Sequence, residues 1–368
     1  MYFILDKNNI SIFKVLVNSF LALIFLCITN ISSFAQEVES TPAGQDIETS
    51  EDKTSFIMHH VKDAHEWHIA TVGHTHITIP LPVIIFSPDR GLEIFSSNRF
   101  LDPETHERVW HAGYRIDEHD HIVAQDPNRT FYDFSITKNV AMLFVTIVLI
   151  LLIMISTANR YKKYPNRAPK GIASFMEPII IFIRDEVVKP NIGPKYLKFL
   201  PYLLTLFFFI WFGNLFGLLP GAANLTGNIA VTFVLALITF IVTNVNGNKY
   251  YWKHIFATPG VPLAILPILV PVEFIGLFTK PISLMIRLFV AITAGHIVIL
   301  SFIGLAFIFN SFLIGVASTI MVIFINIIEI LVATIQAYVF TLFSAMYIGS
   351  AVAEHPHEDH KVDKALIH

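Results

Sequence analysis

Two long apolar stretches near the end of the chain constrain its fold more than any other feature. Residues 261–309 and 311–353 run for 49 and 43 positions with very few charged side chains. A helix that crosses a bilayer at right angles needs only about 20 residues. A much longer helix must tilt or bend to keep its apolar surface in the membrane. We therefore expect a long, strongly tilted helical hairpin that turns near Asn310.

Composition excludes the commonest classes of soluble protein. The 368-residue chain is 54% hydrophobic and 14% charged, whereas soluble domains carry about 25% charged residues. The formal net charge of −3 gives no sign of a nucleic-acid-binding surface. The single cysteine, Cys27, excludes both a disulfide within the chain and a cysteine-based zinc site.

Charge divides the chain into two parts. Residues 36–138 contain 18 of the 28 acidic side chains and 10 of the 16 histidines. From Leu200 to Glu354, charged side chains are rare. The sequence therefore predicts a polar, histidine-rich domain at 36–138, a membrane domain at 139–353 and a short tail at 354–368.

The N-terminus has the pattern of a secretory signal peptide. Residues 15–28 are apolar, two lysines precede them, and Ser33 and Ala35 occupy the small-residue positions before Gln36. A permanent first membrane span is the alternative, although the apolar run is short for a span. We expect residues 1–35 to be removed and the polar domain to lie outside the cytoplasmic membrane.

The polar domain combines strand patterns with a high content of histidine. Residues 76–86 (HITIPLPVIIF) and 91–96 (GLEIFS) predict two paired strands of a small β-rich domain. Histidine-rich tracts can bind a metal ion. Without cysteine or a helical His–Glu signature, a solvated acidic surface is the favoured interpretation, and we expect neither a metal nor a cofactor. The clustered histidines are His59 and His60, His65 and His68, His74 and His76, and His119 and His121.

The apolar segments predict an all-α membrane domain with about five spans. Residues 171–190 are too charged to cross and are expected to form an amphipathic helix at the cytoplasmic interface. The loop at 159–170 holds five basic and no acidic side chains, so the positive-inside rule places it in the cytoplasm. The N-terminal domain is then extracytoplasmic and the C-terminus cytoplasmic. The predicted spans are residues 140–157, 200–220, 228–246, 261–309 and 311–353.

The charged and titratable side chains inside the hairpin are few and regularly spaced. A central charge in a membrane helix costs at least about 2.5–3.5 kcal/mol on insertion scales, so it usually faces a partner or a water path. Glu273, Lys280 and Arg287 are seven residues apart and therefore share one helix face. His296 lies nine residues further, about 180° around the helix. His296 and Glu329 are titratable and surrounded by apolar sequence, as a proton path requires.

Structural interpretations of the same residues remain open. Lys280 can snorkel toward the cytoplasmic interface, and Glu273 can be a wetted residue at the start of its helix. Arg287 or His296 can form a structural pair with Glu329. Ordinary interhelical hydrogen bonds are the alternative for Asn214, Asn228, Thr232 and Gln336.

Short motifs around these residues carry a family resemblance. They are KPISLMIRLF at 280–289, AGH at 294–296, PVE at 271–273, QAYVF at 336–340, N-L-x-G-L-L-P at 214–220 and A-x-A-E-H at 351–355. Together they resemble subunit a of the F-type ATP synthase membrane sector, over about residues 171–355. The polar domain is not part of the common core of that family.

The resemblance implies a non-catalytic stator that conducts protons in the bacterial inner membrane. Subunit a stands beside a rotating ring of c subunits, with b-type peripheral stalk subunits, membrane lipid and a separate catalytic headpiece as further partners. Two offset half-channels lead protons to and from a carboxylate on the ring. Arg287 matches the essential arginine that faces the ring. His296 and Glu329 match a histidine–acid pair in swapped order, and Glu273 and Gln336 match positions of proton access and arginine support.

The mechanism that we expect from the resemblance uses these residues in order. A proton enters from outside through a cleft lined by Glu273, His296 and Glu329, and it neutralises a ring carboxylate, which then turns into lipid at low cost. Near Arg287 the positive charge favours the ionised carboxylate, so the proton leaves toward the cytoplasm. We expect supporting polar roles for Asn214, Asn228, Thr232, Lys280 and Ser283.

The chain departs from the family pattern at two places, and two other functional classes stay open. Val290 and Ala291 replace a usual Gly-Asn, and Gly217 replaces a frequent acid. A secondary transporter would need recurring half-repeats, which the sequence lacks. An intramembrane hydrolase would need a nucleophile or metal motif beside His296 and Glu329, and the sequence has none. The chain also lacks a GxxxxGK[ST] loop, so we expect it to bind no nucleotide.

Overall fold

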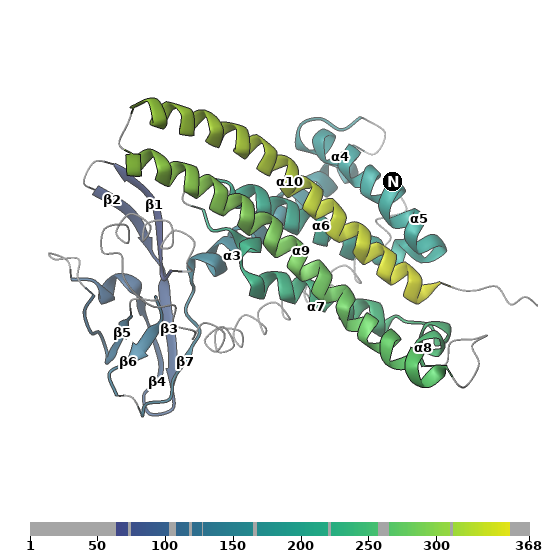
Figure 1. Cartoon of the computed structure of the whole chain (residues 1–368), viewed down its shortest axis with the longest axis horizontal. Coiled ribbons are helices and arrows are strands. Elements are labelled where there is room, and N and C mark those ends of the chain that lie inside the picture. The colour runs from purple at the N-terminus through teal and green to yellow at the C-terminus, as the bar shows by residue number, and fades with distance from the viewer. Residues whose placement is uncertain are drawn as a thin grey trace, which may run out of the picture.

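A small β-rich region is followed by a larger bundle of helices (Figure 1). The predicted signal peptide at 1–35, the expected hairpin turn at Asn310 and the tail at 354–368 lie outside the described residues. The computed structural model describes residues 64–72, 75–102, 108–117, 120–126, 128–164, 168–219, 222–256, 265–309 and 312–353.

Three small antiparallel sheets form the β-rich region. The predicted pairing of residues 76–86 with 91–96 is confirmed, with Ile84 opposite Ile94. The first of these segments is divided at Leu81 between two sheets, because the prolines on either side of Leu81 lack the N–H groups of a continuous ladder. The sheets are β1 (Glu66–Val72) with β2 (Thr75–Pro80), β3 (Pro82–Ser87) between β4 (Gly91–Ser96) and β7 (Tyr132–Asp133), and β5 (Tyr114–Ile116) with β6 (Ile122–Ala124).

An apolar cluster holds the β-rich region together. Val83 of β3, Tyr114 of β5 and Phe100 of the 3₁₀ helix η2 (Ser97–Phe100) are fully buried. Phe95 packs edge-on against Phe100, with ring centres 5.3 Å apart. Alternate residues of β3 are buried, which is the pattern of a strand that turns one face toward a core.

Among the described residues, four helices are long and apolar enough to cross a membrane. Helices α7 and α8, which meet at an angle of 103°, provide a fifth span if the bent pair is counted as one. The prediction of about five membrane helices beside a small β-rich region is therefore confirmed. The helical elements are α3 (Lys138–Lys163), α4 (Ile172–Phe182), the π-helical turn η3 (Ile183–Val188), α5 (Lys189–Ile192), η4 (Gly193–Lys195), α6 (Tyr196–Gly217), η5 (Leu225–Gly227), α7 (Ile229–Val245), α8 (Lys249–Phe256), α9 (Leu266–Phe309) and α10 (Phe312–Val352).

The two longest helices, α9 and α10, run side by side as a hairpin (Figure 1). They contain 44 and 41 residues. At about 1.5 Å per residue each is about 60 Å long, twice the thickness of the hydrocarbon core of a bilayer. The expected hairpin is present, and its strong tilt in the membrane stays a prediction.

The charged segment predicted as an interfacial helix is joined to the bundle. Its residues form α4, η3 and α5, which continue into α6. Ile183 and Val187 are fully buried, and η3 and α5 pack against α10. The charges stay on the outer side, where the Arg184 Nε and Nη2 groups donate to the Asp185 carboxylate at 2.9 and 2.7 Å. An interfacial position for this segment remains a prediction.

Helix α6 provides the centre of the apolar core. It packs against α3 and α10, and residues on several sides of it are buried, among them Leu203, Leu206 and Ile210. A helix that is apolar on all sides is typical of the interior of a membrane protein. The core therefore lies around α6, and the α9–α10 hairpin lies beside it.

Candidate functional site

The register of the α9–α10 hairpin sets the positions of its charged side chains. Lys280 lies over the ring of Tyr347 at 5.5 Å, and Arg287 lies over the ring of Phe343 at 4.4 Å. Further along α9, Gly295 faces Glu329 of α10. Arg287 is seven residues from Lys280 and eight from Gly295, which corresponds to about 10 and 12 Å along a helix. The arginine therefore lies between two separate polar environments.

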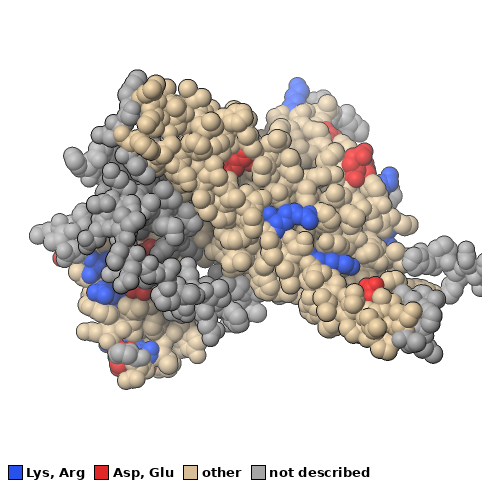
Figure 2. Space-filling model, in the orientation of Figure 1, with Lys and Arg blue, Asp and Glu red and all other residues tan. Residues whose placement is uncertain are grey.

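Arg287 is half-buried on α9, with apolar side chains next to it. Its neighbours Ile286 and Val290 are exposed. Figure 2 shows isolated blue and red side chains on a broad tan surface over α9 and α10. Within the described parts of the chain, no salt bridge joins Arg287 to an acidic side chain. The alternative of a structural ion pair between Arg287 and Glu329 is therefore wrong.

Glu329 is a buried carboxylate in the hairpin. The residue is 3% exposed, and neither carboxylate oxygen has a hydrogen-bond partner among the described residues. A buried polar group without a partner is rare and costly, and it is often linked to function. His296 directly follows the glycine that faces the carboxylate, and the alternative of a structural His296–Glu329 pair stays a prediction.

The absence of a side chain at Gly295 makes room for the Glu329 carboxylate. A Cβ atom at position 295 would lie 2.9 Å from Oε1 and 3.1 Å from the carboxyl carbon of Glu329. Both distances are shorter than ordinary van der Waals contact, so any larger residue would displace the carboxylate. The AGH motif therefore contributes close packing as well as its histidine.

The structure separates Glu273 from the other acid of the hairpin. Glu273 lies near the start of α9, 23 residues before His296, or about 35 Å along a straight helix. It is therefore on the Lys280 side of Arg287, whereas His296 and Glu329 are on the other side. The prediction of one cleft lined by Glu273, His296 and Glu329 is wrong, because the continuous helix α9 holds Glu273 this far from His296.

The predicted supporting residues have different surroundings. Asn214 is buried, donates to the carbonyl oxygen of Ala333 at 3.2 Å and accepts from the Thr226 hydroxyl at 2.5 Å. This bond joins α6 to α10 one turn from Glu329. Gln336 of α10 is half-buried and lies seven residues beyond Glu329, about 10 Å toward the arginine.

The remaining supporting residues make local contacts or are exposed. The side chain of Asn228 accepts from the backbone N–H of Ala230 at 2.9 Å and caps the start of α7. Thr232 donates to the carbonyl oxygen of Ile229 at 2.9 Å within the same helix. Ser283 is exposed on α9. These bonds of Asn228 and Thr232 are local to α7 and, contrary to the interhelical alternative, do not join it to another helix.

The sequence interpretation missed a buried chain of hydroxyl groups. The Tyr202 hydroxyl lies 2.8 Å from the Thr239 hydroxyl, which is 3.5 Å from the hydroxyl of Ser344. This chain connects α6, α7 and α10. Thr239 also lines a small cavity at the junction of α7, α8, α9 and α10, beside Lys280 and Tyr347. The spacing of four between Phe343 and Tyr347 could have indicated that both aromatic rings face α9.

The structure gives a physical reason for one departure from the family pattern. A Cβ atom at Gly217 would lie 3.2 Å from the backbone Cα of Asn224 and 3.2 Å from its side-chain oxygen. An acidic side chain therefore cannot be placed there without a shift of the neighbouring loop. Val290 is exposed beside Arg287, and Ala291 is half-buried.

The structure tests metal binding only for the described histidines of the β-rich region. Among the described residues, no group of three or more His, Cys, Asp or Glu side chains could hold a metal ion. The buried His65 instead lies 3.7 Å from Asp133. Burial raises the pKa of Asp133, but the nearby His65 and the hydrogen bond from Ser135 outweigh burial and hold that pKa below the ordinary value. His59, His60, His74 and His119 lie outside the described residues.

Comparison with known proteins identifies the helical region. The profile of the family described as ATP synthase A chain matches residues 140–349, more than half of the chain. The chain belongs to the ATP synthase A chain family. A second profile, described only as a domain of unknown function, matches residues 56–143, which include the β-rich region.

Individual members of the ATP synthase A chain family are similar over most of the chain. ATP synthase subunit a of Chloroherpeton thalassium is 46% identical over 269 residues, which are 70% of this chain and 79% of the relative. The subunit a of Chlorobium phaeobacteroides strain DSM 266 is 47% identical over 241 residues, 64% of this chain and 70% of the relative. The subunit a of an Anaeromyxobacter species is 41% identical over 257 residues, 66% of this chain and 62% of the relative.

Membership of the ATP synthase A chain family establishes the function. The chain is a multi-pass, proton-conducting stator subunit of a bacterial ATP synthase and is not itself catalytic. As a subunit it works in a larger complex, in which a c-ring and b subunits are the expected partners. The predicted family and function are confirmed, and the transporter and hydrolase alternatives are wrong.

Proposed function

We propose that protons reach and leave the c-ring through two half-channels that end on opposite sides of Arg287. The observation that carries this proposal is the position of the guanidinium group. It is half-buried against the ring of Phe343, without an acidic partner in the described residues, between the Glu329–Gly295 contact and the small cavity beside Lys280.

Glu329 and His296 line the first half-channel. The unpartnered carboxylate of Glu329 can accept a proton without breaking a hydrogen bond of the fold. Asn214 and Thr226 hold α10 against α6 one turn away, which fixes the position of that carboxylate. Protons pass from here to the ring carboxylate, and the neutral acid turns into lipid at low cost.

The second half-channel lies on the Lys280 side of Arg287. Here Thr239, Lys280 and Tyr347 line the cavity between the helices, and Glu273 lies further along α9 toward its start. A ring acid that approaches Arg287 is stabilised in its ionised form, so it releases its proton into this second path. Each charge that crosses supplies about 2.3 kcal/mol per 100 mV, which the ring transmits to the catalytic headpiece.

The orientation follows from charge. The loop between α3 and α4 is rich in basic residues, so the positive-inside rule places this loop, and the end of the bundle where α3 ends, on the cytoplasmic side. The start of α9 then lies toward the cytoplasm, and Glu329 lies toward the outside. The β-rich region is extracytoplasmic, a cleaved signal peptide at 1–35 delivers it there, and the chain resides in the inner membrane.

The decisive experiment replaces the arginine in the intact complex. Arg287→Ala removes the charge that ionises the ring acid, so ATP-driven proton pumping in inverted membrane vesicles is expected to fall to background while the complex still assembles. Arg184→Ala is the matched control, because Arg184 pairs with Asp185 outside the hairpin, and pumping should persist. Normal pumping by the Arg287 variant would refute the proposal.

A further inference from the structure

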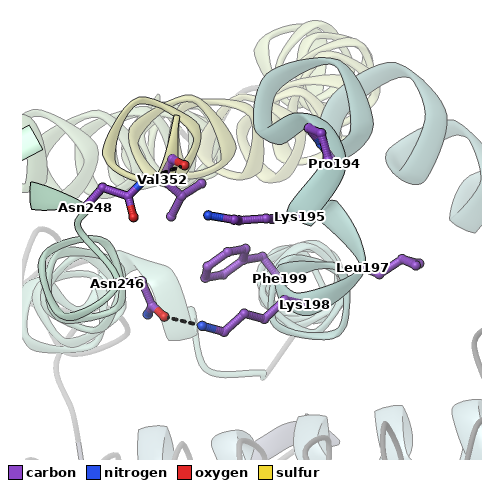
Figure 3. A pocket seen from close by; sticks show the side chains of 8 residues that line it. All are labelled: Pro194, Lys195, Leu197, Lys198, Phe199, Asn246, Asn248 and Val352. Atoms are coloured by element: carbon purple, nitrogen blue, oxygen red, sulfur yellow. Dashed lines mark hydrogen bonds between the residues drawn. The ribbon is translucent and has the colours of Figure 1, made fainter. Parts of the chain in front are cut away.

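A second polar site lies away from the hairpin charges, where the start of α6 meets the ends of α7 and α10. A pocket of about 380 Å³ opens there, and Figure 3 shows its lining side chains. Lys195 and Lys198 enter it from the α6 side, and Asn246 and Asn248 form the opposite wall. None of the lining residues belongs to the proposed proton path, so this site is independent of that path.

The two asparagines form a fixed wall. The backbone N–H of Asn248 donates to the carbonyl oxygen of Ala351 at 2.9 Å. The side-chain amide of Asn248 donates to the carbonyl oxygen of Val352, also at 2.9 Å. The amide of Asn246 donates to the carbonyl oxygen of Val242 at 2.8 Å. The two Asn248 bonds connect the α7–α8 corner to the last turn of α10, and the Asn246 bond fixes its side chain on α7, so the pocket has a rigid frame.

The lysines give the pocket its charge. The Lys198 ammonium group donates to the side-chain oxygen of Asn246 at 2.7 Å. A lysine ammonium group has three donors, so this bond orients Lys198 and leaves further donors for a ligand. The described lining residues include two lysines and no acid. The pocket therefore favours a negatively charged ligand.

We propose that this pocket binds the phosphate of an anionic phospholipid headgroup. The pocket lies at the ends of membrane helices, which is the depth of lipid headgroups, and basic pockets between membrane helices recognise such lipids. Its remaining wall includes the ring of Phe199, which lies between the two lysines in Figure 3 and suits the glycerol and the first carbons of the acyl chains. A free phosphate ion would use only the lysines.

The test uses the assembled ATP synthase in vesicles that contain a photoactivatable phosphatidylglycerol. We expect cross-linking to the peptide around residues 194–199, and we expect the Lys195→Gln, Lys198→Gln double variant to reduce it by roughly tenfold. The double variant Lys249→Gln, Lys253→Gln on α8 is the matched control, because it removes the same charge outside the pocket lining. Assembly and proton pumping report that each variant is folded.

Three outcomes of the cross-linking comparison, and one of a competition with phosphate, would overturn the proposal. The first is unchanged cross-linking in the pocket variant, and the second is an equal loss in the α8 control. The third is equally strong cross-linking by a photoactivatable phosphatidylcholine. A separate arm adds millimolar inorganic phosphate, which should leave the lipid cross-link in place. Displacement by phosphate would assign the pocket to the free ion and not to a lipid.

Discussion

The helices α6 and α9 are both strongly apolar, yet they use polar side chains in opposite ways. In the segment that contains α6, 61% of the most apolar stretch is buried within the protein, against 28% in α9 and 17% in α10. Asn214 of α6 and Thr239 of α7 form hydrogen bonds to neighbouring helices. Polar groups in this part of the bundle hold helices together.

In the hairpin, the decisive polar groups lack such partners. Glu329 accepts no hydrogen bond from the described residues, and Arg287 contacts an aromatic ring and not a carboxylate. A side chain that must exchange protons or interact with the moving ring cannot be held in a permanent hydrogen bond or ion pair within its own subunit. The contrast supports the proposal that satisfied polar residues such as Asn214 belong to the scaffold, whereas Glu329 and Arg287 belong to the proton path.

Among the variants that test this contrast, Glu329→Gln should cause the largest loss of proton pumping. The amide keeps the shape of the side chain but cannot carry a proton, so proton pumping should fall by roughly tenfold or more. Pumping in inverted vesicles measures the effect. Glu329→Asp keeps a titratable group and should retain more activity. Equal pumping by wild type and the glutamine variant would assign Glu329 to the scaffold.

Gly295→Ala should have the next largest effect. The new methyl group would lie 2.9 Å from Oε1 of Glu329 and would displace the carboxylate, so we expect a several-fold loss of pumping and a shifted pH profile. Gly276→Ala is the matched control on the same helix, because nothing lies within 4 Å of its added carbon. Helix propensity favours alanine at both sites by about 1 kcal/mol. Identical behaviour of the two variants would contradict the proposed role.

Asn214→Ala should act on stability more than on pumping. It removes the bond to Ala333 and leaves the Thr226 hydroxyl without its acceptor, at a cost of about 1–3 kcal/mol. The measurement is the temperature at which the subunit leaves the detergent-solubilised complex. Asn326→Ala is the control, because the Asn326 amide bonds only within α10, to the carbonyl oxygen of Val322 at 3.0 Å. The scaffold interpretation fails if both variants dissociate at the same temperature.

The smallest effect is expected in the β-rich region, from Asp133→Asn. The lowered pKa of Asp133 means that its charged form adds stability above the ordinary carboxyl pKa of about 3.9, and this stability is lost as the pH falls through the lowered value. At neutral pH the variant should lose up to about 1 kcal/mol. Faster amide exchange in β3 and β7 of the assembled protein measures this loss.

The control for that variant is Asp126→Asn, because the Asp126 carboxylate accepts only from the backbone N–H of Asn128 in an exposed turn. Exchange in β3 and β7 should stay at the wild-type rate in this control. A faster exchange in both variants would show that the His65 contact is not the cause.

Much of the fold could be predicted from local pattern. The runs of apolar residues located the long helices, because a bilayer demands a minimum length of apolar helix. The rarity of charge inside those runs singled out Arg287, His296 and Glu329. A family resemblance added their functional roles. The helices and the exceptional side chains follow from spacing and composition, whereas the roles follow only from the resemblance.

The sequence by itself therefore determined which side chains are exceptional and on which face of their own helix they lie. Only the tertiary structure decided which of them meet. The apposition of Gly295 and Glu329 and the pocket between Lys195 and Asn248 both join residues of different elements. Helical periodicity is a local property of about 3.6 residues per turn. Contact between helices depends on their register and packing, which no single segment encodes.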